Sequence, residues 1–151
     1  MKKIFITNDN KAATLLRVVL GLVVFPHGAQ KLLGWFGGFG FTGTMNFFTE
    51  TVQLPWIIGF LVIVIEFVGS LMLIAGVATR FVALLFLINF IGVIITSHIP
   101  NGFFINWLGN QKGEGYEYHL LIIGMAASLL ISGAGKLSVD RVLAKEWGLS
   151  A

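Results

Sequence analysis

Long apolar segments alternate with polar ones along the whole chain, at residues 12–33, 55–78, 81–99 and 118–137. Each is close to the roughly 17–25 residues that a helix needs to cross the hydrocarbon core of a bilayer. The fourth is the shortest and reaches crossing length only by continuing toward residue 137. The pattern predicts an all-α integral membrane protein, a four-transmembrane-helix bundle formed by a single domain, 1–151.

The connections between these segments differ in length. The sequence GVATR predicts a tight hairpin between the second and third segments, whereas residues 34–54 and 100–117 form two long loops of about 20 residues. Both long loops are rich in aromatic residues, and glycines in the first permit tight turns. Two interpretations remain open: an aromatic belt at the membrane interface, or a folded lid over a pocket, in which Trp35 would contact a ligand.

The distribution of charged residues predicts how the chain is oriented across the membrane. Only 11% of the residues are charged, against about 25% in soluble domains, which supports the membrane assignment. The side that would hold both termini carries eight cations: Lys2, Lys3, Lys11, Arg17, Arg80, Lys136, Arg141 and Lys145. The opposite side carries Lys31 and Lys112. The positive-inside rule therefore predicts cytoplasmic termini, and such scattered cations do not form a nucleic-acid-binding stripe.

The chain contains no cysteine. Iron–sulfur ligation, c-type haem attachment and disulfides are thereby excluded. Its three histidines, with Glu66 or Glu117, leave an N/O metal site as an alternative. No closely spaced histidine pair supports that alternative, so we expect no metal.

A single carboxylate interrupts the second apolar segment. Glu66 stands in LVIVIEFVGSLML, and because a carboxylate is costly in hydrocarbon it should face protein and have a partner. His27 and Lys31 lie four residues apart on one face of the first helix. Side chains lean toward the N-terminus of their helix, so Glu66 and His27 lean toward each other in antiparallel neighbours. We predict that they meet, directly or through water, as a catalytic pair; the alternative is that each is structural.

Other polar residues gather near the same end of the predicted bundle. The candidate ligand-binding residues are Lys31, Asn89, His98, Glu117, His119 and Trp35. Histidines and carboxylates with tunable pKa values near one end favour a site, although His98 also suits the interface and Glu117 and His119 suit a helix cap. Arg17 and Arg80 are interpreted as structural polar residues, with Arg17 reaching toward the cytoplasm.

Three stretches resemble a known family. They are FPHGAQKLLGWFGGFG, the run EFVGSLMLIAGVATR that starts at Glu66, and GEGYEYHLL followed by SGAGKLSVD. Together they are similar to the DoxX family of small bacterial membrane proteins, over nearly the whole chain. The resemblance implies a multi-pass four-helix protein of the bacterial cytoplasmic (inner) membrane. The recurrent family positions fall on Arg17, His27, Gly28, Lys31, Glu66, Gly76, Arg80 and His119.

The resemblance also suggests a function. Some relatives are quinone-linked thiosulfate oxidoreductase subunits, and others are tied to membrane oxidoreductase complexes or quinone resistance. We therefore expect a membrane-embedded redox subunit with a quinone pocket in the outer half of the bundle. No residue carries electrons unaided, so an enzyme would need a membrane or soluble oxidoreductase partner as electron donor. The absence of cysteine argues against sulfur-relay chemistry.

Two further interpretations stay open. The chain could be a non-catalytic membrane binder or an assembly scaffold for partner oxidoreductases, holding a lipid or no ligand. A proton-coupled carrier is weaker, because one short domain shows none of the internal repeats usual in transporters. Contact with the lipid bilayer is expected in every case, and small-residue faces leave a homo-oligomer open.

Overall fold

A computed structural model describes residues 5, 7 and 9–148, and this part of the chain is helical without strands. The elements, in chain order, are α1 (Lys11–Leu33), a 3₁₀ turn (Trp35–Gly37), α2 (Gly40–Asn46), a π-helical turn (Phe47–Thr51), α3 (Trp56–Val64), a second π-helical turn (Ile65–Gly69), α4 (Ser70–Ala75), α5 (Thr79–Val93), a third π-helical turn (Ile94–His98), a second 3₁₀ turn (Ile99–Asn101), α6 (Glu117–Ser132) and α7 (Val139–Glu146).

Three of the helical stretches are long and apolar enough to cross a membrane: Lys11–Leu33, Trp56–Ala75 and Thr79–Asn101. They confirm the first three predicted segments. The fourth apolar helix, α6, has 16 residues. It ends at Ser132 rather than continuing toward residue 137, because Gly133 and Gly135 adopt positive φ angles that turn the chain away from a helix.

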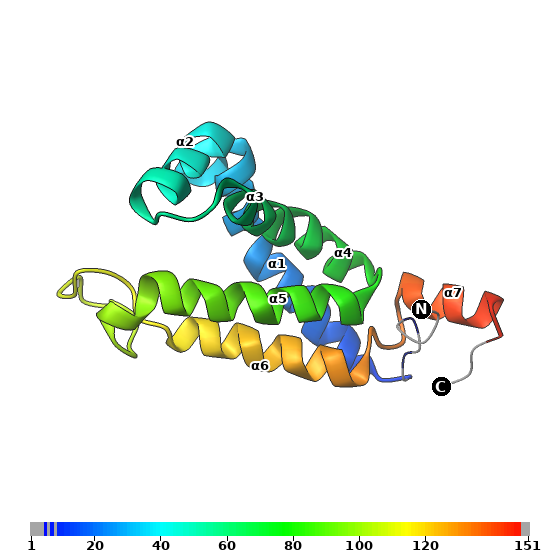
Figure 1. Cartoon of the computed structure of the whole chain (residues 1–151). Helices are drawn as coiled ribbons and strands as arrows, with labels where there is room; N and C mark the ends of the chain where they lie inside the picture. Colours follow the sequence, from blue (N-terminus) through cyan, green and yellow to red (C-terminus); the bar gives the residue numbers. More distant parts are fainter. Residues whose placement is uncertain (1–4, 6, 8, 149–151) are drawn as a thin grey trace.

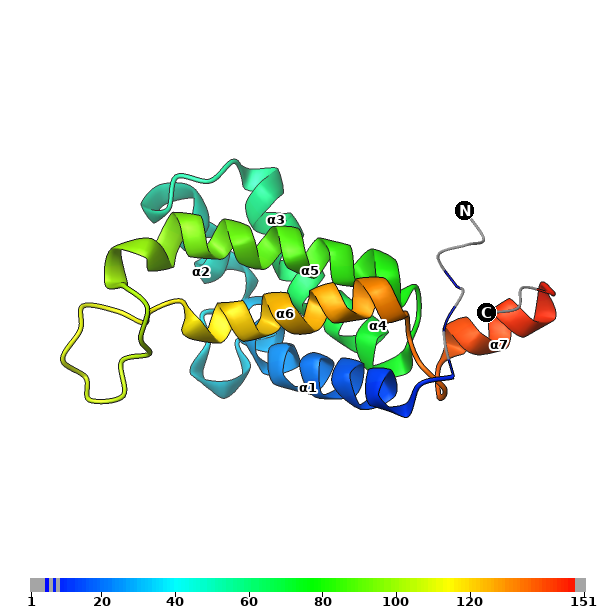
Figure 2. The same ribbon diagram turned by 90° about the horizontal axis from the view of Figure 1, so that it is seen from below.

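The long helices pack side by side around one apolar core. α5 lies along α6, and α1 packs against α6 and against α4 with its preceding π-helical turn (Figures 1 and 2). Fully buried apolar side chains from all of these elements meet at the centre: Leu20, Val24, Leu73, Val82, Ala83, Phe86, Phe90, Ile122, Ala126 and Leu129. The outward faces of the same helices are also apolar, as expected for helices that contact lipid.

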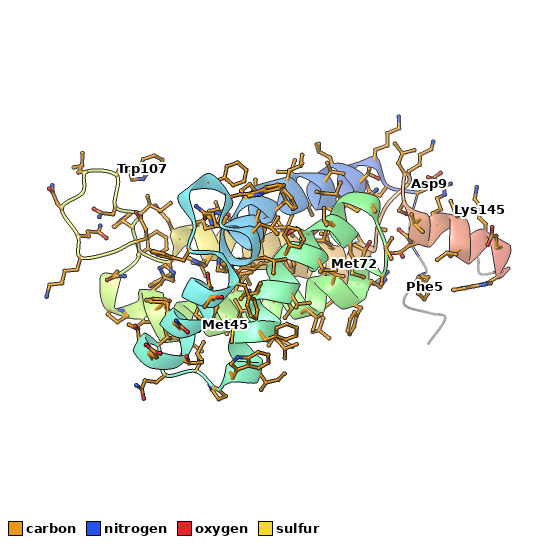
Figure 3. The ribbon with its side chains drawn as sticks, turned by 90° about the horizontal axis from the view of Figure 1, so that it is seen from above. Phe5, Asp9, Met45, Met72, Trp107 and Lys145 are labelled. Carbon is orange, nitrogen blue, oxygen red and sulfur yellow. The ribbon has the colours of Figure 1, made fainter. Side chains whose placement is uncertain are left out.

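The two ends of this bundle differ. Asp9 and Lys145 lie at the end that carries the start of α1 and α7, whereas Trp107 lies at the tip of the α5–α6 connection at the other end (Figure 3). We call these the terminal end and the loop end. The connection after α1 is not irregular, since it folds into α2 and its flanking turns, and it packs on α1 at Gly38, where a Cβ atom would collide with the backbone of Gln30.

The terminal end is held together by two buried charged residues. Arg17 donates from Nε to the carbonyl oxygen of Ala134 (2.8 Å) and from Nη1 to that of Leu73 (2.8 Å), and Nη2 donates to Leu137. Asp140 accepts from the backbone nitrogens of Ala78 (2.6 Å) and Thr79 (2.8 Å). Arg17 is therefore buried inside the protein rather than extended toward water, and α7 is joined to the α4–α5 hairpin.

The sequence pattern did not predict α7. Its apolar positions Val139 and Val142 are separated by charged ones, and an eight-residue amphipathic helix gives a weak signal beside four apolar segments. Ser138 begins the helix as its N-cap, accepting from the backbone nitrogen of Arg141 at 3.2 Å. Residues 133–137, predicted to continue the fourth apolar segment, form a turn, and α7 begins beyond them.

Candidate functional site

The position of Glu66 depends on a close contact between two backbones. Glu66 lies on the π-helical turn Ile65–Gly69, and Gly28 of α1 faces it. A Cβ atom on Gly28 would lie 2.5 Å from the backbone nitrogen of Phe67 and 2.6 Å from the carbonyl carbon of Glu66. Only glycine permits this approach, which brings the widened turn directly against α1.

Glu66 forms an ion pair with Lys31. The Nζ atom of Lys31 lies 2.7 Å from Oε2 of Glu66, and Nδ2 of Asn89 donates to Oε1 at 3.4 Å. The Glu66 side chain is 3% exposed and that of Lys31 is 26% exposed. The carboxylate thus faces protein, between α1 and α5, as a charge in this segment requires.

Glu66 and His27 were predicted to meet directly or through water; the carboxylate of Glu66 contacts Lys31 and Asn89 rather than His27, and a contact through water stays a prediction. His27 lies one turn before Lys31 on α1, and its ring is exposed and lies beside Tyr118, with 6.1 Å between ring centroids. Lys31 replaces it because its long side chain folds back along α1, with Nζ 3.5 Å from the carbonyl oxygen of His27.

The energies favour an intact pair. Charges 2.7 Å apart attract by about 6 kcal/mol at an effective dielectric constant of about 20. The cost of removing each ion from water is several kcal/mol, so the pair gives little net stability. Loss of one partner is expensive, however, because the other charge would stay buried without compensation.

A cleft of about 250 Å³ opens beside Lys31. One side is formed by Gln30 and Lys31 of α1, and the other by the segment that follows α1. Its lining residues are Gln30, Lys31, Gly37, Gly38, Phe39, Thr44, Phe47 and Phe48. The cleft combines aromatic walls with an ammonium group and an amide group, a composition that suits a flat apolar molecule with carbonyl oxygens.

A second group of polar side chains lies at the loop end of α5 and α6. His119 is 8% exposed, and its ring centroid lies 4.1 Å from that of His98, 5.6 Å from that of Tyr118 and 5.9 Å from that of Phe90. Nδ1 of His98 lies 2.8 Å from the carbonyl oxygen of Glu114. The structure therefore brings together His98 and His119, two of the predicted ligand-binding residues.

Two predicted ligand-binding residues lie outside both groups. Trp35 is 52% exposed and packs edge-to-face on Phe36, and it does not line the cleft. Oε1 of Glu117 accepts from the backbone nitrogen of Ile105 at 2.8 Å and so anchors the α5–α6 connection. Both residues stabilise the loop end, the first at the surface and the second through the backbone.

The two arginines lie elsewhere. Arg17 joins α1 to the backbone of α4 and of residues 134–137, as described above. Arg80, at the start of α5, donates from Nη1 to the carbonyl oxygen of Leu130 in α6. Both lie at the terminal end, away from Glu66. Among the described residues, no group of three histidine or acidic side chains is close enough to hold a metal ion.

Sequence reasoning did not mark some residues of these groups as ligand-binding. Gln30, Phe47 and Phe48 line the cleft. In the sequence Gln30 is noticed only as a polar group at the end of the first segment, and the two aromatic residues only as part of a possible lid. Tyr118 lies between His27 and His119, but it was read only as the start of an apolar segment. The available signal was the sequence EYH, in which Tyr118 stands between two candidate site residues, Glu117 and His119.

Comparison with known proteins identifies relatives. The DoxX family pattern matches residues 12–99. The chain is 32% identical to "Putative oxidoreductase CatD" of Bacillus subtilis over 83% of this chain and 82% of that protein. It is also 32% identical to "Inner membrane protein YqjF" of Escherichia coli, over 76% of this chain and 82% of that protein. No solved structure matches the chain.

Proposed function

Because the chain belongs to the DoxX family of membrane proteins, we propose that it is a membrane-embedded subunit of a redox system that binds a quinone or a quinone-like molecule. The binding site is the cleft beside Lys31. The relative YqjF is named an inner membrane protein and CatD carries oxidoreductase in its name. Both names support a redox role in the bacterial inner membrane.

One observation carries this proposal: the buried Glu66 is paired with the lysine that lines the cleft. A quinone needs an apolar wall for its ring and donors for its carbonyl oxygens. Phe39, Phe47 and Phe48 supply the wall, and Lys31 and Gln30 supply N–H donors. Glu66 lies directly behind Lys31, where it can hold the ammonium in place and exchange a proton with it.

Quinone reduction takes two electrons and two protons. The chain's own side chains can bind the ring and move protons, but they do not supply electrons. The electron donor is therefore a partner oxidoreductase, either in the membrane or soluble. The role of this subunit is to hold the quinone where that donor can reach it.

The same proposal includes the topology. α6 would serve as a fourth, short crossing, and the terminal end would face the cytoplasm, where most of the cations lie. The cleft would then lie in the outer half of the bilayer. Substituted-cysteine labelling from either side tests this orientation on a background that contains no cysteine.

Titration of the purified protein with a short-chain quinone and with the corresponding quinol tests the binding. We expect saturable binding that Lys31→Met weakens at least tenfold, because the ammonium donor is lost. Lys112→Met is the matched control, since Lys112 is exposed on the α5–α6 connection. Identical curves for the two variants and the wild type would remove the site.

A non-catalytic membrane binder or scaffold is the second candidate. It is favoured by the size of the cleft, about 250 Å³, since small-molecule pockets usually span about 300–1,000 Å³. On this account Glu66→Gln lowers folding yield, whereas the redox account predicts a folded protein without function.

A further inference from the structure

Two buried polar atoms of α6 lack hydrogen-bond partners among the described residues: Oη of Tyr118 and Nδ1 of His119. A buried polar group without a partner is unfavourable, because it has lost its hydrogen bonds to water and gained none in return. The two residues are consecutive and their rings are 5.6 Å apart. Buried polar groups of this kind are ordinarily satisfied by bound water, so a water molecule bound at each of these two atoms would supply the missing partner.

The polar group formed by Tyr118 and His119 continues to the loop end through His98. Its ring lies 4.1 Å from that of His119 between centroids, and its Nδ1 lies 2.8 Å from the carbonyl oxygen of Glu114. A carbonyl oxygen only accepts, so Nδ1 carries the hydrogen and Nε2 of the neutral ring is the acceptor. His98 is only half-buried, and it can therefore take up a proton from water and pass it inward.

On its other side, the same polar group approaches Glu66 through His27 and Lys31. The ring centroid of Tyr118 lies 6.1 Å from that of His27. Nζ of Lys31 lies 3.5 Å from the carbonyl oxygen of His27 and 2.7 Å from Oε2 of Glu66. Every element packed around these rings contributes a polar or charged group: His27 and Lys31 from α1, Glu66 from the π-helical turn, Asn89 from α5, and His98 from the turn after it. Phe90 provides an apolar side to the ring of His119.

We propose that His98, His119 and Tyr118, bridged by water, form a proton route between the loop-end surface and Glu66. His98 takes up and releases the proton at Nε2, because its Nδ1–H is donated to the carbonyl oxygen of Glu114. His119 accepts a proton at one ring nitrogen and releases one from the other, and the Tyr118 hydroxyl accepts and donates in the same way. After one proton has moved, the His119 ring is the other tautomer and the Tyr118 hydroxyl and the waters point the other way, so each must reorient before a second proton passes. This inference rests on the proposed function, because the protons would serve the quinone held beside Lys31.

Time-resolved infrared spectroscopy of the protein in lipid nanodiscs, without quinone, tests the route. Photolysis of a caged proton acidifies the medium, and the carboxylic C=O band of Glu66 is then followed as it appears. Glu66→Gln identifies that band by its loss. We expect Tyr118→Phe and His119→Phe to slow its appearance at least tenfold while its final amplitude at equilibrium stays unchanged.

Tyr116→Phe is the matched control. Tyr116 lies two residues earlier and packs on Phe103, so its variant should respond at the wild-type rate. Should His119→Phe fail to fold, Tyr118→Phe removes only a hydroxyl and decides alone. Equal rates in wild type, Tyr118→Phe and Tyr116→Phe would overturn the route, as would the absence of a Glu66 carboxylic band at every pH. Neither result bears on the quinone titration, which is read separately with Lys31→Met.

Discussion

The Nζ atom of Lys31 lies 2.7 Å from the Oε2 atom of Glu66, and this ion pair joins the last turn of α1 to the π-helical turn Ile65–Gly69. One partner is buried, and the other also lines the cleft between α1 and the segment that follows it. A single contact thus connects the packing of the bundle to the surface that we propose for ligand binding. Most of the tests below act on this contact or its surroundings.

Removal of Lys31 should destabilise the protein more than removal of the whole pair. Lys31→Met leaves Glu66 buried without its cation, which we expect to lower the free energy of unfolding by about 3 kcal/mol, the low end for a broken buried pair. The double variant Lys31→Met/Glu66→Leu should recover most of that loss. Unfolding in mixed micelles measures both. A double variant no more stable than Lys31→Met would contradict this account of the pair.

Gly28 should tolerate no side chain. In Gly28→Ala the added Cβ would meet the backbone at Phe67 and Glu66, so the π-helical turn must move away from α1. We expect a loss of about 1–3 kcal/mol, as for overpacked cores, with a weaker Lys31–Glu66 contact.

Gly124→Ala is the control for that substitution. No atom lies within 4 Å of a Cβ atom placed there, and alanine favours a helix over glycine by up to about 1 kcal/mol. The same unfolding measurement should therefore show the two Gly→Ala variants shifting in opposite directions. Similar shifts in the free energy of unfolding would mean that Gly28 lies farther from the backbone of Glu66 and Phe67 than the structure shows.

Aromatic substitutions should separate the cleft from the rest of the surface. Phe47 lines the cleft, whereas Trp35 is exposed outside it. We expect Phe47→Ala to weaken quinone binding severalfold and Trp35→Ala to leave the dissociation constant unchanged. Fluorescence or calorimetric titration provides the measurement. If Trp35→Ala weakens quinone binding and Phe47→Ala does not, Trp35 belongs to the binding site and Phe47 does not.

Asp140 should give the terminal end a pH-dependent stability. Burial raises the pKa of this carboxyl above its ordinary value of 3.8, although hydrogen bonds from Thr79 and Ala78 act against that shift. A raised pKa in the folded state means that the folded protein holds the proton more tightly than the unfolded one. The contribution of Asp140 is therefore fully present below pH 3.8 and is lost as the pH rises through the folded-state pKa.

The Asp140→Asn variant isolates this effect. Its side chain does not titrate, so the variant lacks the stability that Asp140 contributes at low pH, and its acid-side decline of stability should be steeper than in the wild type. It should also lose one of the two backbone hydrogen bonds, at a cost of about 1 kcal/mol. Unfolding measured from pH 3 to pH 7 gives both quantities, and parallel curves for the two proteins would contradict a raised pKa for Asp140.

Much of the fold follows from hydropathy alone. The first three apolar segments became helices close to their predicted bounds, because length and composition suffice to identify them. The cost of a charge in hydrocarbon correctly predicted that Glu66 faces protein. The DoxX resemblance, inferred from three motifs, is confirmed over residues 12–99.

Contacts between segments were harder to predict. The partner of Glu66 is Lys31 rather than His27, because the close contact at Gly28 and the π-helical turn set the register between α1 and α3–α4, and neither is visible in residue spacing. The cleft arises where the segment after α1 packs back onto Gln30. Such contacts depend on how the segments pack against each other, and the hydrophobic periodicity within one segment does not show this.

Photoaffinity labelling with an azidoquinone tests the central claim most directly. The probe is bound to the protein in nanodiscs, photolysed, and located by peptide mass spectrometry. We predict labelling at Gln30 or Lys31 and within residues 37–48, which competing unlabelled quinone removes and Lys31→Met reduces. Labelling spread over the lipid-facing residues of α5 and α6, unchanged by competitor or by Lys31→Met, would contradict a quinone site beside the Lys31–Glu66 pair.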